Sequence, residues 1–72
     1  MNAKIYSVIK ERRKLLGIDQ KSLARIAGIS VHALSDLETG KGNPTLSTLL
    51  NVYNALGLTL TPSIKELESS DA

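Results

Sequence analysis

The sequence predicts a small all-α domain of four helices, and three observations support this. Apolar residues recur at helical spacing between Ile5 and Leu56. Polar residues that cap helices stand before the expected segments, and glycines follow them. With 72 residues the chain is expected to form one domain over 1–62, followed by a short and largely disordered tail over 63–72. A core of this size is only marginally stable, so a second copy is an expected partner.

The first helix is expected to begin after Asn2, a plausible N-cap, and to run to about residue 16. Gly17 would end it, because glycine accepts the left-handed backbone found after many helices. The expected inward face holds Ile5, Val8, Ile9, Leu15 and Leu16.

Residues 19–38 predict two short helices joined by a tight turn. Asp19 and Ser30 are the expected N-caps of these helices. Gly28 supplies the turn, and Ala24, four residues earlier, lets the second helix approach closely. Leu34 and Leu37 should face the core, which leaves the other side of that helix exposed.

A loop over 39–44 contains two glycines and a proline and separates these helices from the last one. Thr45 is the expected N-cap of the fourth helix, which Gly57 would end. Its expected inward face holds Leu46, Leu49, Leu50, Tyr53 and Leu56. Core packing explains Tyr53, to which we assign no functional role.

Apolar and polar residues then alternate with a period of two through Leu58, Thr59, Leu60 and Thr61, before Pro62. This alternation predicts a short strand, and a strand needs a partner for its backbone groups. The sequence offers no second strand, so we expect two copies of the chain to pair antiparallel across a two-fold axis. The alternative is an extended tail lying on its own domain.

Composition excludes several classes of function. The chain has no cysteine and one histidine, so we expect neither a disulfide, nor a metal site, nor a small-molecule cofactor. No apolar run approaches the roughly 20 residues of a membrane span, and the N-terminus lacks a signal-peptide pattern. We therefore expect a soluble protein of the bacterial cytoplasm, located at the nucleoid when bound to DNA.

Charge is unevenly distributed along the chain. The net charge is +2, but residues 1–62 hold eight basic against four acidic side chains, and the tail is acidic. A basic body is expected of a nucleic-acid binder. It is also common on helical surfaces of other proteins.

The composite pattern resembles the helix-turn-helix family of Cro, the phage repressors and the Xre-type regulators. It consists of Gln20-x-x-Leu23-Ala24-x-x-x-Gly28-Ile29-Ser30, then Leu34-Ser35-x-Leu37-Glu38-x-Gly40, then Asn43-Pro44, within a match over roughly residues 5–57. The resemblance implies a lambda-repressor-like fold whose third helix enters the major groove of double-stranded DNA. It also implies that Arg13 pairs with Glu38, which would fasten the first helix to the third.

The exposed side of the third helix is the expected reading face. The candidate base-reading residues are Ser30, Val31, His32, Ser35 and Asp36. At the start of the helix, His32 would donate to guanine and Val31 would contact a thymine methyl group. Asp36 would accept from cytosine or repel phosphate. This face lacks the Arg, Lys, Gln or Asn that makes two hydrogen bonds to one base, so DNA shape and water are expected to contribute to specificity.

Candidate phosphate contacts lie on both sides of this helix. They are Gln20, Lys21, Arg25, Lys41 and Asn43. Gln20 stands at the start of a helix, where backbone amides and a side-chain amide can meet a phosphate. Lys21 and Arg25 touch either phosphates or only water. Catalysis is not expected, because His32 and Asp36, four residues apart on an exposed helix, are typical of a surface contact.

The strand at 58–61 resembles that of HipB-like antitoxins, which accompany HipA-like kinase toxins. The expected function is therefore a dimeric transcriptional repressor on an inverted-repeat operator, serving as the antitoxin and autoregulator of a HipBA-like system. Two alternatives stay open: a stand-alone Xre-type repressor, and a helix-turn-helix fold used only for protein interaction.

Overall fold

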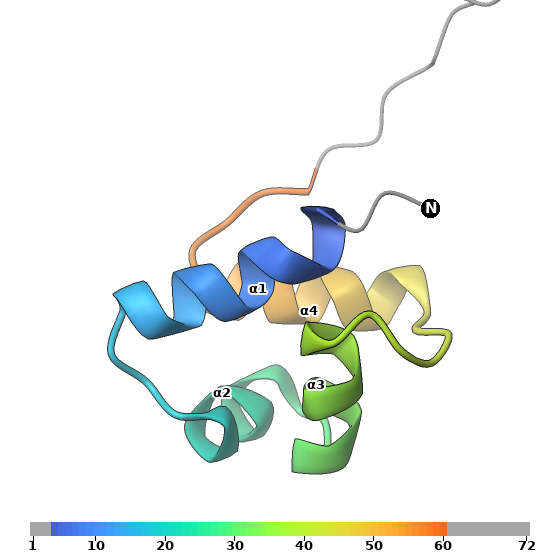
Figure 1. Cartoon of the computed structure of the whole chain (residues 1–72), viewed down its shortest axis with the longest axis horizontal. Helices are drawn as coiled ribbons and strands as arrows, with labels where there is room; N and C mark the ends of the chain where they lie inside the picture. Colours follow the sequence, from blue (N-terminus) through green and yellow to red (C-terminus); the bar gives the residue numbers. More distant parts are fainter. Residues whose placement is uncertain (1–3, 61–72) are drawn as a thin grey trace, which may run out of the picture.

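The computed structural model describes residues 4–60, which form four helices and no strand. The helices are α1 (Lys4–Leu15), α2 (Gln20–Ala27), α3 (Val31–Glu38) and α4 (Leu46–Ala55). Figure 1 shows α1 and α4 above α2 and α3. Helix α2 packs against both α3 and α4, and α3 packs against α1. The all-α fold of four helices predicted from the sequence is confirmed.

The N-caps predicted for the last three helices are confirmed. Asp19 Oδ1 accepts a hydrogen bond from the Ser22 backbone N–H at 2.8 Å. In the same way Ser30 Oγ accepts from Ala33 at 3.0 Å, and Thr45 Oγ1 accepts from Thr48 at 3.1 Å. Each cap satisfies one backbone donor that the first helical turn leaves without a partner, so local sequence alone determines where these helices begin.

The turn between α2 and α3 is made at Gly28, whose φ is +75°. The Ile29 N–H donates to the Ala24 carbonyl at 3.0 Å, and the Gly28 N–H donates to the Arg25 carbonyl at 3.2 Å. These two bonds close the end of α2 in the pattern that requires a left-handed residue. A Cβ atom at Gly28 would meet nothing within 4 Å, so backbone conformation rather than space favours glycine here.

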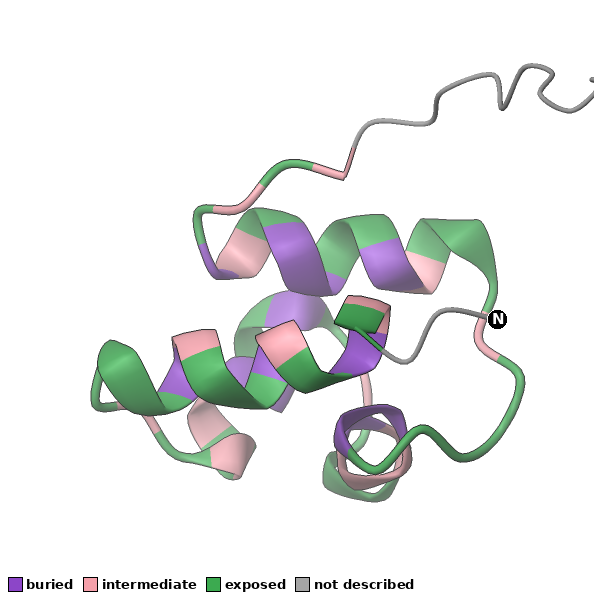
Figure 2. Ribbon diagram, turned by 45° about the horizontal axis from the view of Figure 1, so that its top comes forward, coloured by how far each residue is buried: buried purple, intermediate pink, exposed green. Residues whose placement is uncertain are grey.

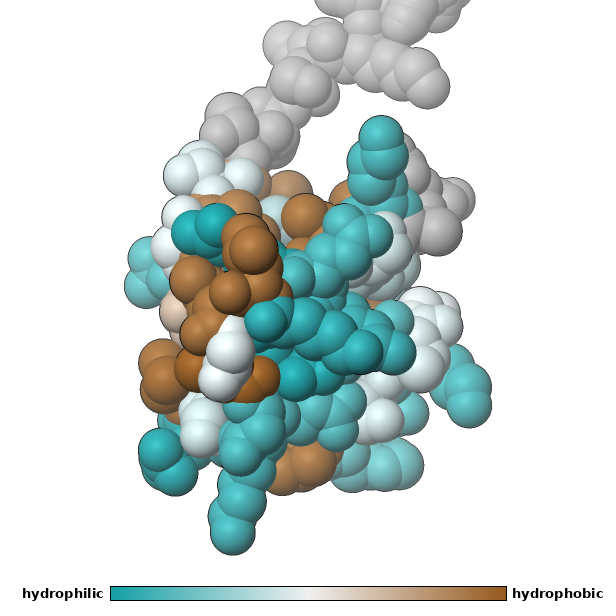
Figure 3. Space-filling view, turned by 60° about the vertical axis from the view of Figure 1, so that its left-hand side comes forward, coloured by the Kyte–Doolittle hydropathy of each residue, from teal (hydrophilic) through white to brown (hydrophobic). Residues whose placement is uncertain are grey.

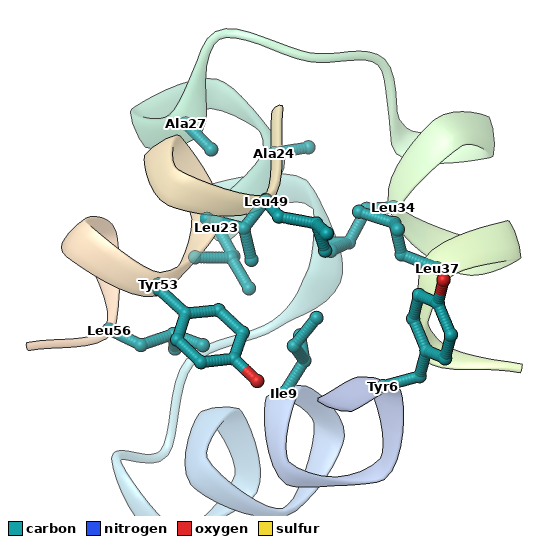
Figure 4. Close-up of a cluster of buried hydrophobic side chains, with 11 residues drawn as sticks. Tyr6, Ile9, Leu23, Ala24, Ala27, Leu34, Leu37, Leu49, Tyr53 and Leu56 are labelled. Carbon is teal, nitrogen blue, oxygen red and sulfur yellow. The ribbon is translucent and has the colours of Figure 1, made fainter. Parts of the chain in front are cut away.

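All four helices contribute to a single core (Figure 4). Figure 2 shows that the buried residues lie on the sides of the helices that face one another. The hydroxyl of Tyr53 donates to the Ile5 carbonyl at 2.7 Å and ties α4 to the start of α1. Burial raises the pKa of this hydroxyl. The buried hydrophobic residues are Tyr6, Ile9, Leu23, Ala24, Ala27, Leu34, Leu37, Leu49, Val52, Tyr53 and Leu56.

Two of the predicted inward faces are partly wrong. In α4, Leu46 and Leu50 are 59% and 41% exposed, whereas Val52 is fully buried. The two sets share Leu49, Tyr53 and Leu56, and helical spacing allows either Val52 or the pair Leu46 and Leu50 to complete the face. In α1, Leu15 and Leu16 are exposed because the helix ends at Leu15 and the chain then turns.

Exposed apolar side chains are not spread evenly over the surface. Figure 3 shows that on one face they gather along one side, while hydrophilic residues cover most of the rest. None of the helices within residues 4–60 is long and apolar enough to cross a membrane. The large exposed hydrophobic residues of the described chain are Leu15, Leu16, Ile26, Val31, Leu46 and Leu50.

The described residues after α4, 56–60, form neither helix nor strand in the single chain. The side chains of Leu58 and Leu60 are half-buried against the core, and Thr59 between them is exposed. This is the alternation expected of a strand, but a strand also needs a second chain or segment to pair with. Thr61, the Asn2 cap and the tail over 63–72 lie outside the described residues.

Candidate nucleic-acid interface

The outward side of α3 presents a short row of exposed residues at the start of the helix. The side chain of His32 is 89% exposed, and Ser30 and Val31 are exposed beside it. Ser35 and Asp36, one turn further, are half-buried. Ser30 Oγ accepts from Ala33, so its hydroxyl hydrogen remains to donate to a base or a phosphate, and one lone pair remains to accept from a base. The best-exposed candidates for base reading therefore lie in the first turn of α3.

His32 and Asp36 lie on the same face of α3, one turn apart. His32 Nε2 is 3.4 Å from Asp36 Oδ2, which is an ion-pair distance when the imidazole is protonated. The Asp36 carboxylate thus faces the histidine, and both groups lie on the side of the helix that the sequence assigns to base reading.

Helix α3 is anchored to α1 by a buried pair between Arg13 and Glu38. Arg13 Nε donates to Glu38 Oε2 at 2.6 Å, and Arg13 Nη2 donates to Glu38 Oε1 at 3.0 Å. The side chains are 11% and 2% exposed. A guanidinium that binds both carboxylate oxygens fixes direction as well as distance. The end of α3 is therefore held in one orientation on α1.

Two further contacts extend this pair. Arg13 Nη1 donates to the Ile18 carbonyl in the turn before α2 at 2.9 Å. Gln20 Nε2, from the first turn of α2, donates to Glu38 Oε1 at 3.0 Å. The Glu38 carboxylate thereby connects α1, α2 and α3 at one point, which we call the Glu38 junction (Arg13, Gln20 and Glu38).

The Glu38 junction also determines the ionisation of its members. Burial alone would raise the pKa of Glu38, but the hydrogen bonds from Arg13 and Gln20 and the charge of Arg13 outweigh it and lower that pKa. The hydrogen bond to Glu38 raises the pKa of Arg13. Both side chains are therefore charged at neutral pH, and each stabilises the charged form of the other.

A shallow hollow lies beside the reading face, between α3, the 39–44 loop and the start of α4. Asp36 lines it on α3, Lys41 and Asn43 line it in the loop, and Thr48 lines it on α4. The Lys41 N–H donates to the Asp36 carbonyl at 2.8 Å, which holds the loop against the end of α3. The fold thus brings two of the phosphate candidates next to a base-reading candidate.

The other phosphate candidates lie on α2. Lys21 and Arg25 are exposed, four residues apart on that helix. Gln20 is half-buried, and its amide already donates to Glu38. Its second amide N–H is left to donate to a phosphate. Gln20 thus carries a structural contact besides the phosphate contact predicted for it.

Sequence reasoning missed Thr39 and Thr48 near this surface and assigned Thr45 only the role of an N-cap. The hydroxyl of Thr39 donates to the carbonyls of Ser35 and Asp36, both at 3.1 Å, and closes the end of α3. Thr45 and Thr48 line the hollow and are bonded to each other through their hydroxyls at 3.0 Å. The only signal for the Thr45–Thr48 pair was the spacing of two threonines around a helix start, and this spacing predicted a cap but not a place in the hollow.

The arrangement within residues 4–60 gathers no group of three or more His, Cys, Asp or Glu side chains. What it offers is an exposed helix start, flanking basic and amide groups, and a rigid connection to the core. The family described as Helix-turn-helix matches residues 9–63. The chain belongs to the helix-turn-helix family.

Several curated proteins are similar to this helix-turn-helix chain. The HTH-type transcriptional regulator DdrOP3 of Deinococcus deserti is 37% identical over 65 residues, which cover 90% of this chain and 50% of that protein. The HTH-type transcriptional regulator PuuR of Escherichia coli is 32% identical over 63 residues, covering 88% of this chain and 34% of PuuR. The putative HTH-type transcriptional regulatory protein MJ1164 of Methanocaldococcus jannaschii is 34% identical over 64 residues, which cover 89% of this chain and 20% of that protein. The chain thus spans half or less of these relatives.

Proposed function

We propose that this helix-turn-helix chain is a sequence-specific DNA-binding transcriptional regulator that represses by occupying its operator. The observation that carries the proposal is the geometry of α3. Its first turn is exposed, with His32 89% exposed, while its last residue, Glu38, is held by α1 and α2. A helix that is rigidly anchored at one end and bare at the other is suited to enter a major groove.

Base recognition in this proposal depends on the first turn of α3. His32 donates to guanine N7 or O6, and Val31 packs against a thymine methyl group. Asp36 accepts from a cytosine amino group or keeps phosphates away from the middle of the helix. Since no residue of this face makes two hydrogen bonds to one base, DNA shape contributes to specificity.

Phosphate contacts on two sides of α3 fix its position in the groove. Lys41 and Asn43 contact the backbone beyond the end of α3, and Gln20, Lys21 and Arg25 contact it from α2. The hollow that brings Lys41 and Asn43 beside Asp36 supports this division. Such contacts make binding depend strongly on salt.

We propose further that the repressor is a homodimer on an inverted repeat, with Leu58–Thr61 of two copies pairing antiparallel. Within residues 4–60, the backbone groups of Thr59 and Leu60 have no hydrogen-bond partner, and the side chains alternate between half-buried and exposed. This supports strand pairing across a two-fold axis. The two copies of α3 would then lie about one helical turn, roughly 34 Å, apart on the DNA.

We further propose that the repressor also serves as an antitoxin. The resemblance of the 58–61 segment to HipB-like antitoxins supports a HipA-like kinase toxin as partner, with DNA binding serving autoregulation. A stand-alone Xre-type repressor binds the same operator without that partner. A helix-turn-helix fold used only for protein contacts binds no DNA.

One experiment separates these possibilities: purification of the tagged full chain from its native host, followed by selection of bound DNA. The proposal expects an inverted-repeat sequence, together with a co-purifying kinase if the antitoxin role holds. An operator without a kinase leaves a stand-alone repressor. Absence of any enriched DNA from the selection would contradict the DNA-binding proposal itself.

A further inference from the structure

We infer that the dimer interface extends well beyond the 58–61 segment, over a neutral strip on the outer side of α4 that a second copy of the chain covers. The inference rests on the dimer in the proposed function and deepens it. We call this surface the α4 strip. It runs from Val8 on α1, past Leu58, across Leu50 and Asn54 on α4, to Ile26 at the end of α2.

The α4 strip consists of three shallow hollows that share residues and are therefore continuous. The first lies between α1 and the segment after α4, and it shares Tyr53, Leu58 and Thr59 with the second. The second lies over α4 and shares Asn51 and Asn54 with the third, which reaches the turn after α2. Leu58 and Thr59 thus lie between the first two hollows, and Leu60 lines the second.

The chemistry of the α4 strip differs from that of the reading face. Apart from Lys4, the residues that line it carry no charge. Leu50 is 41% exposed and Ile26 is 61% exposed, and the amides of Asn51 and Asn54 lie between them. Depletion of charge at the centre, with apolar side chains and a few amides, is typical of a protein interface and unsuited to phosphates. No residue of α3 lines the strip.

A second copy is the occupant that the backbone and the area requirement support. Thr59 and Leu60, whose backbone groups have no hydrogen-bond partner among residues 4–60, lie within the α4 strip, so strand pairing would bring the partner directly onto it. A two-stranded sheet of this length is marginal alone, whereas stable interfaces bury roughly 1,200–2,000 Å² in total. The remaining area has to come from the hollows on either side of the strand.

The position of Leu50 is explained by the same interface. The helical pattern allowed Leu50 to face the core, yet it lies in the hollow beside Leu60 and remains partly exposed. Across a two-fold axis each substitution is present twice, once on each copy. A charge introduced at Leu50 therefore acts on the interface from both sides.

The test is sedimentation velocity on the full chain over a range of concentrations, comparing wild type with Leu50→Lys and Leu15→Lys. Leu15 is the matched control, because it is 76% exposed and lines none of the three hollows. We expect wild type and Leu15→Lys to dimerise alike. Leu50→Lys should raise the dimer dissociation constant by roughly 100-fold, about tenfold for each copy. Circular dichroism melts confirm that the variants fold.

Two results would overturn the inference: a wild-type chain that stays monomeric at all concentrations, or a Leu50→Lys variant that dimerises as well as Leu15→Lys. The variant Ile26→Lys tests the far end of the α4 strip, where an unchanged dissociation constant would also contradict its stated extent. Binding of DNA is measured separately on the same proteins. Salt-dependent DNA binding by a monomer would refute the homodimer and the strip but leave the DNA-binding proposal standing. A Leu50-dependent dimer without DNA binding would refute the regulator and leave the strip standing.

Discussion

Replacing Arg13 with alanine should cost far more stability than its position on a charged stretch of α1 suggests. The variant leaves the Glu38 carboxylate, 2% exposed, with one remaining side-chain donor, Gln20. Removing one partner of a buried ion pair costs about 3–5 kcal/mol of stability. Because Gln20 still donates to Glu38, we expect the loss here to lie near ~3 kcal/mol. For a chain of 72 residues the whole free energy of unfolding is roughly 4–11 kcal/mol. A fall in melting temperature of at least roughly 12 °C follows.

The same variant should show a distinctive dependence on pH. In the wild type the pKa of Glu38 is lowered from its ordinary value of 4.5, so its contribution is present above that value and is lost as pH falls through the lower, folded-state pKa. Without Arg13, the effect of burial on Glu38 dominates, so the folded variant is stabilised when this carboxyl group is protonated. The stability difference between wild type and Arg13→Ala should therefore shrink as pH falls toward and then below about 4.5.

The assay is urea unfolding followed by circular dichroism, from neutral pH to pH 3, with Lys14→Ala as the control. Lys14 is exposed on the same helix, so its replacement should change the free energy of unfolding by less than about 0.5 kcal/mol. Equal losses for Arg13→Ala and Lys14→Ala at neutral pH would refute the reasoning. A stability difference that grows on acidification would contradict the sign assigned to Glu38.

The same urea measurement at neutral pH checks three smaller predictions. Gly28→Ala should cost about 1 kcal/mol from its positive φ alone, and Gly28→Asn should cost less; equal losses would point to packing instead. Tyr53→Phe removes the 2.7 Å bond to the Ile5 carbonyl and should cost roughly 1 kcal/mol, whereas no change would mean that water replaces it. Val52→Ala should cost at least about 1 kcal/mol more than Leu46→Ala, because only Val52 is fully buried; the reverse order would support the predicted face of α4.

The parts of the fold that the sequence predicted correctly depend on neighbouring residues. The caps at Asp19, Ser30 and Thr45 and the turn at Gly28 each use partners within five positions, so a short pattern contains all the information. The inward face of α4 was harder, because Leu46 and Leu50 continue the same helical spacing as Leu49 and the true register depends on α2.

The candidate site was predictable to a different degree. The residue types of α3 indicated its exposed face, but the contact from Gln20 to Glu38 joins positions 18 residues apart and has no local signal. The fold, rather than any pattern, brings Lys41 and Asn43 beside Asp36. The strand at 58–61 was predicted from the alternation of apolar and polar residues, and it stays a prediction, because a strand needs a second chain or segment to pair with.

The central claim is that α3 reads DNA bases while residues around it bind phosphates. Its most direct test is the affinity of the full chain for its selected operator and for an unrelated duplex, measured by fluorescence anisotropy over a series of salt concentrations. We expect affinity to fall steeply with salt. His32→Ala should weaken operator binding only, whereas Lys41→Ala should weaken binding to both duplexes and lower the salt slope by about 1. Affinity that is independent of salt, or equal loss of specificity from both substitutions, would contradict this claim.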